Sequence, residues 1–256
     1  MKEKKTCKVV SQTMVTKGIY DLRINVGSMA VEAKPGQFVA LYSGDASRLL
    51  PRPISICEIF SSEGIIRLVY RIAGKGTEEF SHLSAGDEIE VMGPLGNGFT
   101  QGKGRAVLMG GGIGIPPMLE LAKTLSLTAM PTVILGYRDS DCFLEKEFEP
   151  YADVIIATED GSRGIKGNVI DAIRAAGTEC DTIYACGPTP MLRGIKNYAE
   201  EQNITAYISM EEKMACGIGA CLACVCKSKD TDAHTNVHNK RICKEGPVFD
   251  AREVEL

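Results

Sequence analysis

The sequence predicts an α+β multidomain protein with three units: an antiparallel β-barrel over residues 1–102, a parallel α/β unit over 103–209, and a small cysteine-rich unit over 210–256. Three observations support this prediction. Short alternating or β-branched runs separated by turn residues fill the first unit. Strand-like and helix-like runs alternate through the second, as a parallel sheet requires. The third contains a cluster of cysteines with the spacing of metal ligands.

Length and composition describe a soluble globular chain with room for two compact domains and a small appendage. Its 256 residues are 44% hydrophobic and 24% charged, which is ordinary for folded domains. The formal net charge of −4 gives no electrostatic case for nucleic acid. No apolar run approaches the roughly 20 residues that cross a bilayer. We therefore expect neither a nucleic-acid partner nor a membrane span.

The first unit contains short runs of the kind that form the strands of a barrel. The expected strands cover residues 7–10, 19–26, 38–41, 65–72 and 88–92. Turn signals separate them, namely Lys-Pro-Gly at 34–36, Ala-Gly-Asp at 85–87 and Gly-Pro at 93–94. One short helix is expected at 78–83, after the Gly-Lys-Gly-Thr run at 74–77.

The second unit begins near residue 103, where the pattern changes to alternating strands and helices. Its expected strands cover residues 106–109, 132–135, 153–157, 182–185 and 205–209. Its expected helices cover residues 118–127, 144–149, 169–176 and 190–202. This order predicts a parallel sheet with helices as the crossovers.

A glycine-rich turn at 110–117 follows the first strand of this unit and opens its first helix. Glycines let the backbone approach a pyrophosphate, and the helix N-terminus presents free N–H groups to it. Pro117 stands where the usual fingerprint has a third glycine, and proline suits a first helical turn. The motif alone also fits a tight turn without a ligand. The candidate nucleotide-binding residues are Gly111, Gly112, Gly114 and Pro116.

The next strand is followed by the position where the ribose of a dinucleotide would bind. The residues there are Tyr137, Arg138 and Asp139. Arg138 would favour a 2′-phosphate, whereas Asp139 would favour a free 2′-hydroxyl. These residues alone leave the choice between NAD and NADP open.

The barrel contains a second candidate phosphate site in the run Arg52-Pro53-Ile54-Ser55. Arg52 can pair with a diphosphate and Ser55 can donate a hydrogen bond to a flavin or phosphate. In isolation, the run fits an edge strand with a solvated arginine better than a phosphate site. Gly76 and Thr77, at the head of a short helix, add a second place to seat phosphate.

Four cysteines near the C-terminus have the C-x4-C-x2-C…C spacing of plant-type [2Fe–2S] ferredoxins. They are Cys216, Cys221, Cys224 and Cys243. Cys226 is the alternative fourth ligand. It comes only two residues after Cys224, so in extended backbone its side chain points the other way. We therefore favour Cys243 as the fourth ligand.

The chain has ten cysteines, and in a secreted protein such a number would suggest disulfides. Here Ser11, Gln12 and Lys17 interrupt any apolar signal segment, and the cysteines cluster. We expect metal binding in a reducing cytoplasm. The scattered cysteines are expected to have no role; they are Cys7, Cys57, Cys142 and Cys180.

The polar segment 227–239 is long for a loop between cluster ligands. Its two histidines, His234 and His238, have a spacing that also occurs in metal sites. Four cysteines already complete a cluster, so we expect a solvated loop. His82 is expected at a helix end, and Glu211 and Glu212 are expected just ahead of the cluster loop.

Taken together, these units resemble the ferredoxin–NADP reductase superfamily over nearly the whole chain. The resemblance implies that FAD binds the barrel and NAD binds the α/β unit, with Cys186-Gly187-Pro188 beside the nicotinamide. The FAD residues that it implies are Arg52, Pro53, Ile54, Ser55, Val69, Tyr70, Arg71, Gly76 and Thr77. The NAD residues are Gly111, Gly112, Gly114, Pro116, Cys186, Gly187 and Pro188.

The cysteine-rich tail is similar to that of the electron-transfer subunits of type B dihydroorotate dehydrogenase. That family implies a cytoplasmic heterotetramer with two FMN-containing catalytic subunits, serving pyrimidine biosynthesis. Electrons would pass from dihydroorotate through FMN, the [2Fe–2S] cluster and FAD to NAD, and no side chain of this chain would act as a catalytic acid or base. The alternatives are a flavin/iron–sulfur reductase subunit that serves ferredoxin, hydrogenase or another reductase, and a non-enzymatic redox sensor.

Overall fold

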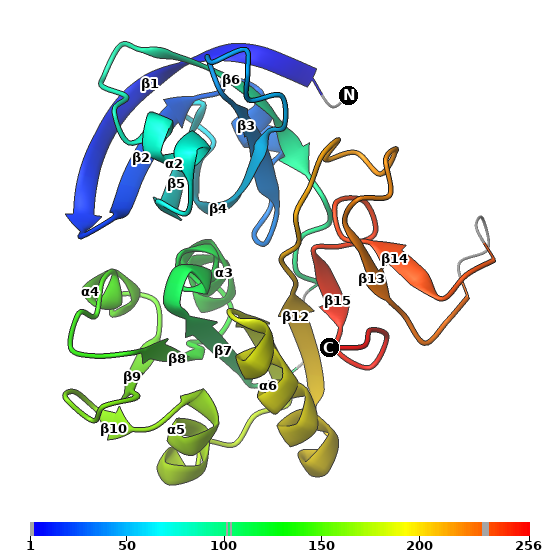
Figure 1. Cartoon of the computed structure of the whole chain (residues 1–256). Helices are drawn as coiled ribbons and strands as arrows, with labels where there is room; N and C mark the ends of the chain where they lie inside the picture. The colour runs from blue at the N-terminus through cyan, green and yellow to red at the C-terminus, as the bar shows by residue number, and fades with distance from the viewer. Residues whose placement is uncertain (1–2, 101, 103, 232–235) are drawn as a thin grey trace.

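The computed structural model describes residues 3–100, 102, 104–231 and 236–256. Within these residues, six antiparallel strands close into a barrel in the order β1-β2-β5-β4-β3-β6 (Figure 1). The strands are β1 (Glu3–Thr16), β2 (Ile19–Asn25), β3 (Phe38–Tyr42), β4 (Arg52–Phe60), β5 (Ile65–Arg71) and β6 (Glu88–Leu95). Two short helices accompany them, α1 (Met29–Glu32) and α2 (Lys75–Phe80). The predicted antiparallel barrel is confirmed.

Alternation along the strands separates the barrel core from its outer face. On β5, Ile66 and Leu68 are fully buried in the barrel core. Val69, one residue on, belongs instead to an apolar cluster shared with α3 (Pro116–Ser126) of the second unit. Because successive side chains of a strand point to opposite faces, Arg67 and Arg71 share the outer face with Val69. This face of the barrel therefore meets the α/β unit.

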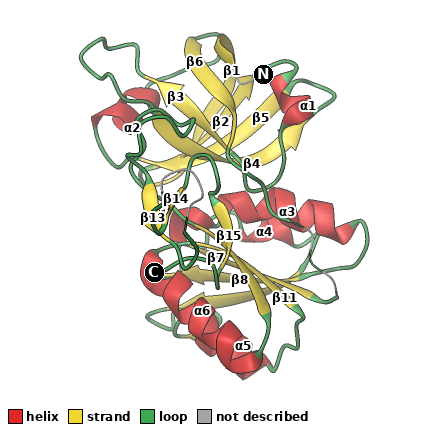
Figure 2. Cartoon of the chain, turned by 90° about the vertical axis from the view of Figure 1, so that its right-hand side faces the viewer, coloured by secondary structure: helices red, strands yellow, loops and turns green. Residues whose placement is uncertain are grey.

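The second unit is a doubly wound sheet. The described residues give it the strand order β10-β9-β8-β7-β11-β12-β15. Its strands are β7 (Ala106–Gly111), β8 (Thr132–Tyr137), β9 (Asp153–Thr158), β10 (Ile165–Lys166), β11 (Thr182–Cys186), β12 (Thr205–Ser209) and β15 (Val248–Asp250). A 3₁₀ turn, η1 (Gly112–Gly114), precedes α3, and the other helices are α4 (Glu145–Phe148), α5 (Val169–Ala176) and α6 (Thr189–Gln202). Helices α3 and α4 lie between sheet and barrel, and α5 and α6 cover the opposite face (Figure 2).

The helix starts follow from local capping. The Asn168 side chain accepts a hydrogen bond from Ile170 N at 2.8 Å, and Asp171 accepts one from Asn168 N at 2.8 Å, so α5 begins with a capping box. Helix α2 begins three residues before the predicted residue 78. The reason is that Thr77 Oγ1 accepts from Ala73 N at 2.8 Å, which caps the turn.

The cysteine-rich segment contains a small hairpin of β13 (Val225–Lys227) and β14 (Asn239–Arg241). Its last strand, β15, pairs antiparallel with β12, and Phe249 lies opposite Ile208. The cysteine-rich segment therefore packs directly on the α/β unit, where the buried side chain of Phe249 completes the apolar face of the sheet. The boundaries at residues 102 and 209 remain a prediction.

The hairpin also accounts for the long polar segment at 227–239. Its two ends are held together because Cys226 lies opposite Lys240 in the ladder, so the segment between them does not set the separation of the cysteines. His238 lies near Lys229, with Nδ1 at 2.9 Å from that carbonyl. His234 lies outside the described residues. In the described part of the chain, no helix is long and apolar enough to cross a membrane.

Candidate functional site

The loop at 216–224, here called the cluster loop, aims backbone N–H groups at cysteine sulfurs. Cys216 Sγ accepts hydrogen bonds from Ala220 N at 3.2 Å and Cys221 N at 3.4 Å. Cys243 Sγ accepts one from Gly219 N at 3.1 Å. Such bonds stabilise negative charge on sulfur and are the environment of iron–sulfur clusters.

The four predicted sulfurs are brought together in pairs. Cys221 donates its main-chain N–H to Cys216 Sγ at 3.4 Å, and Cys243 donates its own to Cys224 Sγ at 3.4 Å. Across residues 3–100, 102, 104–231 and 236–256, no three His, Cys, Asp or Glu side chains are arranged to hold a single metal ion. Two pairs of sulfurs instead match the requirements of a group with two irons, each taking two thiolates. The donor set fits a [2Fe–2S] cluster.

Electrostatics differ between the two pairs. Burial raises the pKa of Cys216, but hydrogen bonds from Ile218 N, Cys221 N and Ala220 N outweigh it and lower the value to about 6. Burial and the neighbouring Cys224 raise the pKa of Cys243 to about 12. Cys243 is fully buried, whereas Cys221 is exposed. One edge of the site therefore faces solvent.

Cys226, the alternative ligand, is turned away from this group. Its thiol donates a hydrogen bond to the Lys240 carbonyl at 3.5 Å, across the β13–β14 hairpin. These observations support Cys243 as the fourth ligand.

The sequence analysis did not identify Arg241, which lies two residues before Cys243 and braces the cluster loop. Its Nη1 donates to the Gly219 carbonyl at 3.1 Å, and its Nε donates to Glu245 at 3.0 Å. The guanidinium is largely buried and puts a positive charge beside the loop. A basic residue close to the last cysteine was the only signal in the sequence.

In the barrel, the structure brings the two candidate phosphate-binding elements together. A Cβ placed on Gly76 would overlap the guanidinium of Arg52, so glycine is required for the arginine to lie there. The two positions are far apart in sequence, and their contact forms one basic surface at the start of α2. Pro53, Ile54 and Ser55 follow on β4, paired with Ala40, Val39 and Phe38 of β3.

Two of the predicted flavin residues have side-chain oxygens that form hydrogen bonds within the barrel unit. Tyr70 is buried in the barrel core, where its hydroxyl donates to Gln12 at 3.0 Å, because its strand position faces inward. The Thr77 hydroxyl donates to the Gly74 carbonyl at 3.0 Å and caps α2. Both side-chain oxygens are therefore engaged within the protein, and the part of these residues in the flavin site stays a prediction.

Arg71 connects the barrel to the glycine turn. It is exposed at the end of β5, and its Nη2 lies 3.8 Å from where a Cβ of Gly112 would stand. Gly112 has a φ of +54°, which glycine adopts without strain. The predicted flavin strand and the predicted nucleotide turn thus meet at this point.

The glycine turn and the Cys-Gly-Pro element meet at the switch point of the sheet. Strand β7 lies between β8 and β11, and the chain order reverses between β7 and β11, where ligands of doubly wound sheets bind. A Cβ on Gly114 would stand 2.5 Å from the Cys186 carbonyl carbon, and one on Gly111 would stand 3.3 Å from Pro188 Cδ. Pro116 then opens α3, and Gly187 lies against Gly111 N.

Of the three residues predicted to contact a ribose, one is buried and two are exposed. Tyr137 is buried and donates its hydroxyl to the Phe143 carbonyl at 2.8 Å, so it supports the sheet rather than a ligand. Arg138 and Asp139 are exposed.

The thiol of Cys186, in the Cys-Gly-Pro element, has a raised pKa. Burial raises it to about 12, although a hydrogen bond with Ser209 acts to lower it.

The C-terminal segment matches one family model, the iron–sulfur cluster binding domain of dihydroorotate dehydrogenase B, over residues 211–255. The whole chain is 42% identical to a Fusobacterium nucleatum protein named dihydroorotate dehydrogenase B (NAD(+)), electron transfer subunit, over 98% of both chains. It is 44% identical to the Listeria monocytogenes serotype 4a protein of the same name, over 97% of this chain and 98% of that one. The chain belongs to the family of dihydroorotate dehydrogenase B electron transfer subunits. This confirms the predicted family and the predicted class of electron-transfer oxidoreductase.

Solved structures agree with this family fold. The structure of an NADH-dependent reduced ferredoxin-NADP oxidoreductase superposes with a TM-score of 0.87 at 30% identity, covering 97% of this chain and 89% of that one. A ferredoxin reductase in carbazole 1,9a-dioxygenase shares the fold at 19% identity, with a TM-score of 0.68 over 79% of this chain and 67% of that one. The barrel and the α/β unit are therefore those of the ferredoxin reductase fold.

Proposed function

We propose that this chain is the electron-transfer subunit of a dihydroorotate dehydrogenase complex. It passes electrons from the FMN of a catalytic subunit, through a [2Fe–2S] cluster and FAD, to NAD in pyrimidine biosynthesis. The family names support this proposal because they specify the electron transfer subunit and NAD(+). We further propose a cytoplasmic complex with two copies of each subunit.

The observation that carries the proposal is the contact between the three candidate cofactor sites. The cluster loop lies against the barrel, where a Cβ on Gly217 would stand 3.2 Å from Leu95. Asn97, just beyond β6, donates its main-chain N–H to the Gly246 carbonyl at 2.6 Å. The barrel meets the nucleotide turn through Arg71 and Gly112. An electron path through all three sites needs such continuity.

The residues of this chain position the groups and exclude water. Flavin handles both single electrons and hydride, which joins a one-electron cluster to a two-electron nicotinamide. Arg52 would pair with the pyrophosphate of FAD above Gly76. The glycine turn η1, ahead of α3, would receive the pyrophosphate of NAD, because Pro116 and Pro117 give the helix start no N–H groups of their own. Cys186 would border the nicotinamide at the end of β11.

Anaerobic co-purification tests the proposal. The tagged chain is isolated from its host, its partners are identified by mass spectrometry, and the complex is assayed for NAD reduction with dihydroorotate. An FMN-bearing dihydroorotate dehydrogenase subunit together with that activity would support the proposal. A flavin that NADH fails to reduce in the isolated chain would contradict the nicotinamide assignment.

A second candidate function has one specific observation in its favour. The solved structure with a TM-score of 0.87 is described as a ferredoxin-NADP oxidoreductase, so the same layout serves a ferredoxin in that protein. Co-purification of a ferredoxin, hydrogenase or other reductase subunit would favour this alternative. The sites proposed here would then remain, and the pathway would change.

Arg52→Ala is expected to weaken FAD binding. The variant removes a charge-assisted hydrogen bond worth about 1.5–3 kcal/mol, which corresponds to a roughly tenfold to hundredfold rise in Kd. Fluorescence titration of the apoprotein with FAD measures this change. Arg252→Ala is the control, because that arginine is exposed and pairs with Asp250 instead. Equal Kd values for the two variants would remove Arg52 from the FAD site.

Leu222→Asp is expected to weaken association with the catalytic subunit. Ile218 and Leu222 of the cluster loop are 45% and 47% exposed beside the exposed Cys221, so an apolar rim surrounds the solvent edge of the site. A carboxylate buried there on binding should raise the Kd by about tenfold or more, as measured by sedimentation velocity. Leu127→Asp, at a leucine that is 86% exposed beyond the end of α3, should bind like the parent. Equal binding by both variants would place the partner elsewhere.

A further inference from the structure

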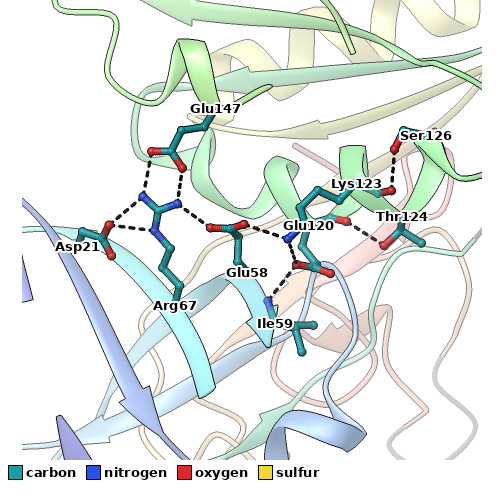
Figure 3. A network of polar contacts seen from close by, with 9 residues as sticks. All are labelled: Asp21, Glu58, Ile59, Arg67, Glu120, Lys123, Thr124, Ser126 and Glu147. Carbon is teal, nitrogen blue, oxygen red and sulfur yellow. Dashed lines mark hydrogen bonds and ion pairs between the residues drawn. The ribbon is translucent and has the colours of Figure 1, made fainter. Parts of the chain in front are cut away.

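Six charged side chains gather where the barrel meets the α/β unit, and we call them the interdomain ion cluster (Figure 3). The members from the barrel are Asp21, Glu58 and Arg67, and those from the α/β unit are Glu120, Lys123 and Glu147. They belong to neither phosphate site and ligate no cluster. Glu58 and Arg67 are buried and the other four are partly buried, and burying charge is costly unless each charge is paired and hydrogen-bonded.

Arg67 is the centre of the cluster. Its residue is 3% exposed, and its guanidinium donates to Asp21 at 2.9 Å and to Glu58 at 2.6 Å within the barrel. Both Nη atoms also donate to Glu147 on α4, the second at 3.0 Å. This bidentate pair crosses between the two units and fixes the guanidinium plane as well as its position.

A bulge in β4 brings the second part of the cluster into place. The register shifts between Ile56 and Glu58, which sets Glu58 opposite Arg67 on the face toward α3. Glu58 accepts from Lys123 Nζ at 3.0 Å. Burial would raise the pKa of Glu58, but the hydrogen bonds from Arg67 and Lys123 hold it below its ordinary value.

Glu120 links the two units through a hydrogen bond from a main-chain N–H of the barrel. Its carboxylate accepts from Ile59 N at 2.9 Å, so a side chain of α3 replaces a ladder partner at the end of β4. Burial raises the pKa of Glu120, although the Ile59 N–H lowers it. The contact holds α3 at a fixed distance along β4.

The ion cluster joins the strand and the helix that lead to the candidate flavin and nicotinamide sites. Strand β5 continues from Arg67 to Arg71, about 13 Å further on at ~3.3 Å per residue, where it meets the glycine turn. Helix α3 begins at that turn, and Phe148 of α4 packs in the same apolar cluster as Leu119. A displacement at the ion cluster would therefore move the turn relative to the flavin strand.

We propose that the interdomain ion cluster positions the nicotinamide turn against the flavin, with Arg67 and Glu147 as positioning residues for hydride transfer. The inference rests on the proposed function, because it concerns transfer between the same two cofactors. Four carboxylates surround two cations, and Asp21 Oδ1 is buried without a hydrogen-bond partner among the described residues. Stability alone does not favour four carboxylates around two cations at this partly buried site, since apolar packing stabilises such a contact as well or better.

The test uses Glu147→Ala in the full chain with its cofactors, measured by stopped-flow reduction of FAD by NADH. The limiting rate at saturating NADH should fall about tenfold, while the Kd for NADH stays within about twofold. FAD and iron contents should match the parent, because Glu147 is 41% exposed and Arg67 keeps Asp21 and Glu58. NADH deuterated at C4 should show that hydride transfer itself has slowed. Glu147→Gln should recover part of the rate, since its amide oxygen still accepts one hydrogen bond.

Glu201→Ala is the matched control. Glu201 pairs with Arg174 at 3.1 Å within the α/β unit, so its loss should leave the limiting rate unchanged. If Glu147→Ala has the same limiting rate as the parent, whatever its Tm, the positioning inference is wrong and the proposed function is unaffected. A parent flavin that NADH does not reduce would overturn the proposed function, and this inference would fall with it.

Discussion

Cys243→Ser is expected to abolish the visible absorption of the cluster, whereas Cys226→Ser is expected to preserve it. Cys243 is fully buried, its Sγ accepts a hydrogen bond from Gly219 N at 3.1 Å, and its main-chain N–H donates to Cys224 Sγ at 3.4 Å. Serine offers iron a hydroxyl in place of the softer thiolate, and loss of a ligand should cost more than the tenfold to hundredfold typical of outer-shell partners. Anaerobic absorption and EPR spectra, with iron and FAD contents, measure the outcome.

The FAD content distinguishes loss of a ligand from loss of the fold. Cys243→Ser should retain FAD and its reduction by NADH, because the barrel and the glycine turn lie outside the cluster loop. Cys226→Ser removes a thiol whose hydrogen bond goes to the Lys240 carbonyl, so its spectrum should match the parent. A Cys226→Ser protein without cluster bands would reverse the ligand assignment.

The fold could be predicted from sequence wherever a segment follows one regular pattern. Every barrel strand except β4 and every α/β strand except β10 and β15 alternates or runs apolar, and these strands were predicted. Strand β4 was not found independently, because Pro51 and Pro53 interrupt its pattern and prolines argue against a strand. Strand β15 was missed because three residues carry no period, and only its pairing with β12 defines it.

The candidate site could be predicted where a motif is local, and less well where it depends on contacts distant in sequence. The cysteine spacing located the cluster loop, yet the bracing role of Arg241 depends on its bond to Gly219. Tyr70 was assigned to the flavin through the family resemblance, but strand alternation turns its side chain into the core. The interdomain ion cluster joins residues as far apart in sequence as Arg67 and Glu147. Charged residues usually lie on the surface, so the sequence alone does not show which of them pair between units.

Gly114→Ala is expected to slow reduction of FAD by NADH about a hundredfold, which is the effect of a misplacement near 1 Å. The added Cβ would stand 2.5 Å from the Cys186 carbonyl carbon and 2.6 Å from Gly187 N. Both are main-chain atoms, so the turn itself must move rather than a side chain. Because the turn packs directly against the Cys-Gly element, the nicotinamide would lose its alignment with the flavin.

Gly194→Ala is the matched control for this prediction. It adds a methyl group inside α6 of the same unit, where the nearest atom, Ile170 Cγ1, lies at an ordinary 3.7 Å. Alanine in a helix interior should raise the free energy of unfolding by about 0.5–1 kcal/mol and leave the reaction with NADH unchanged. Stopped-flow rates for both variants, with FAD contents equal to the parent, therefore isolate the close approach at Gly114. If Gly114→Ala reacts as fast as Gly194→Ala, the nicotinamide does not lie against this turn, and the NAD residues assigned to it are wrong.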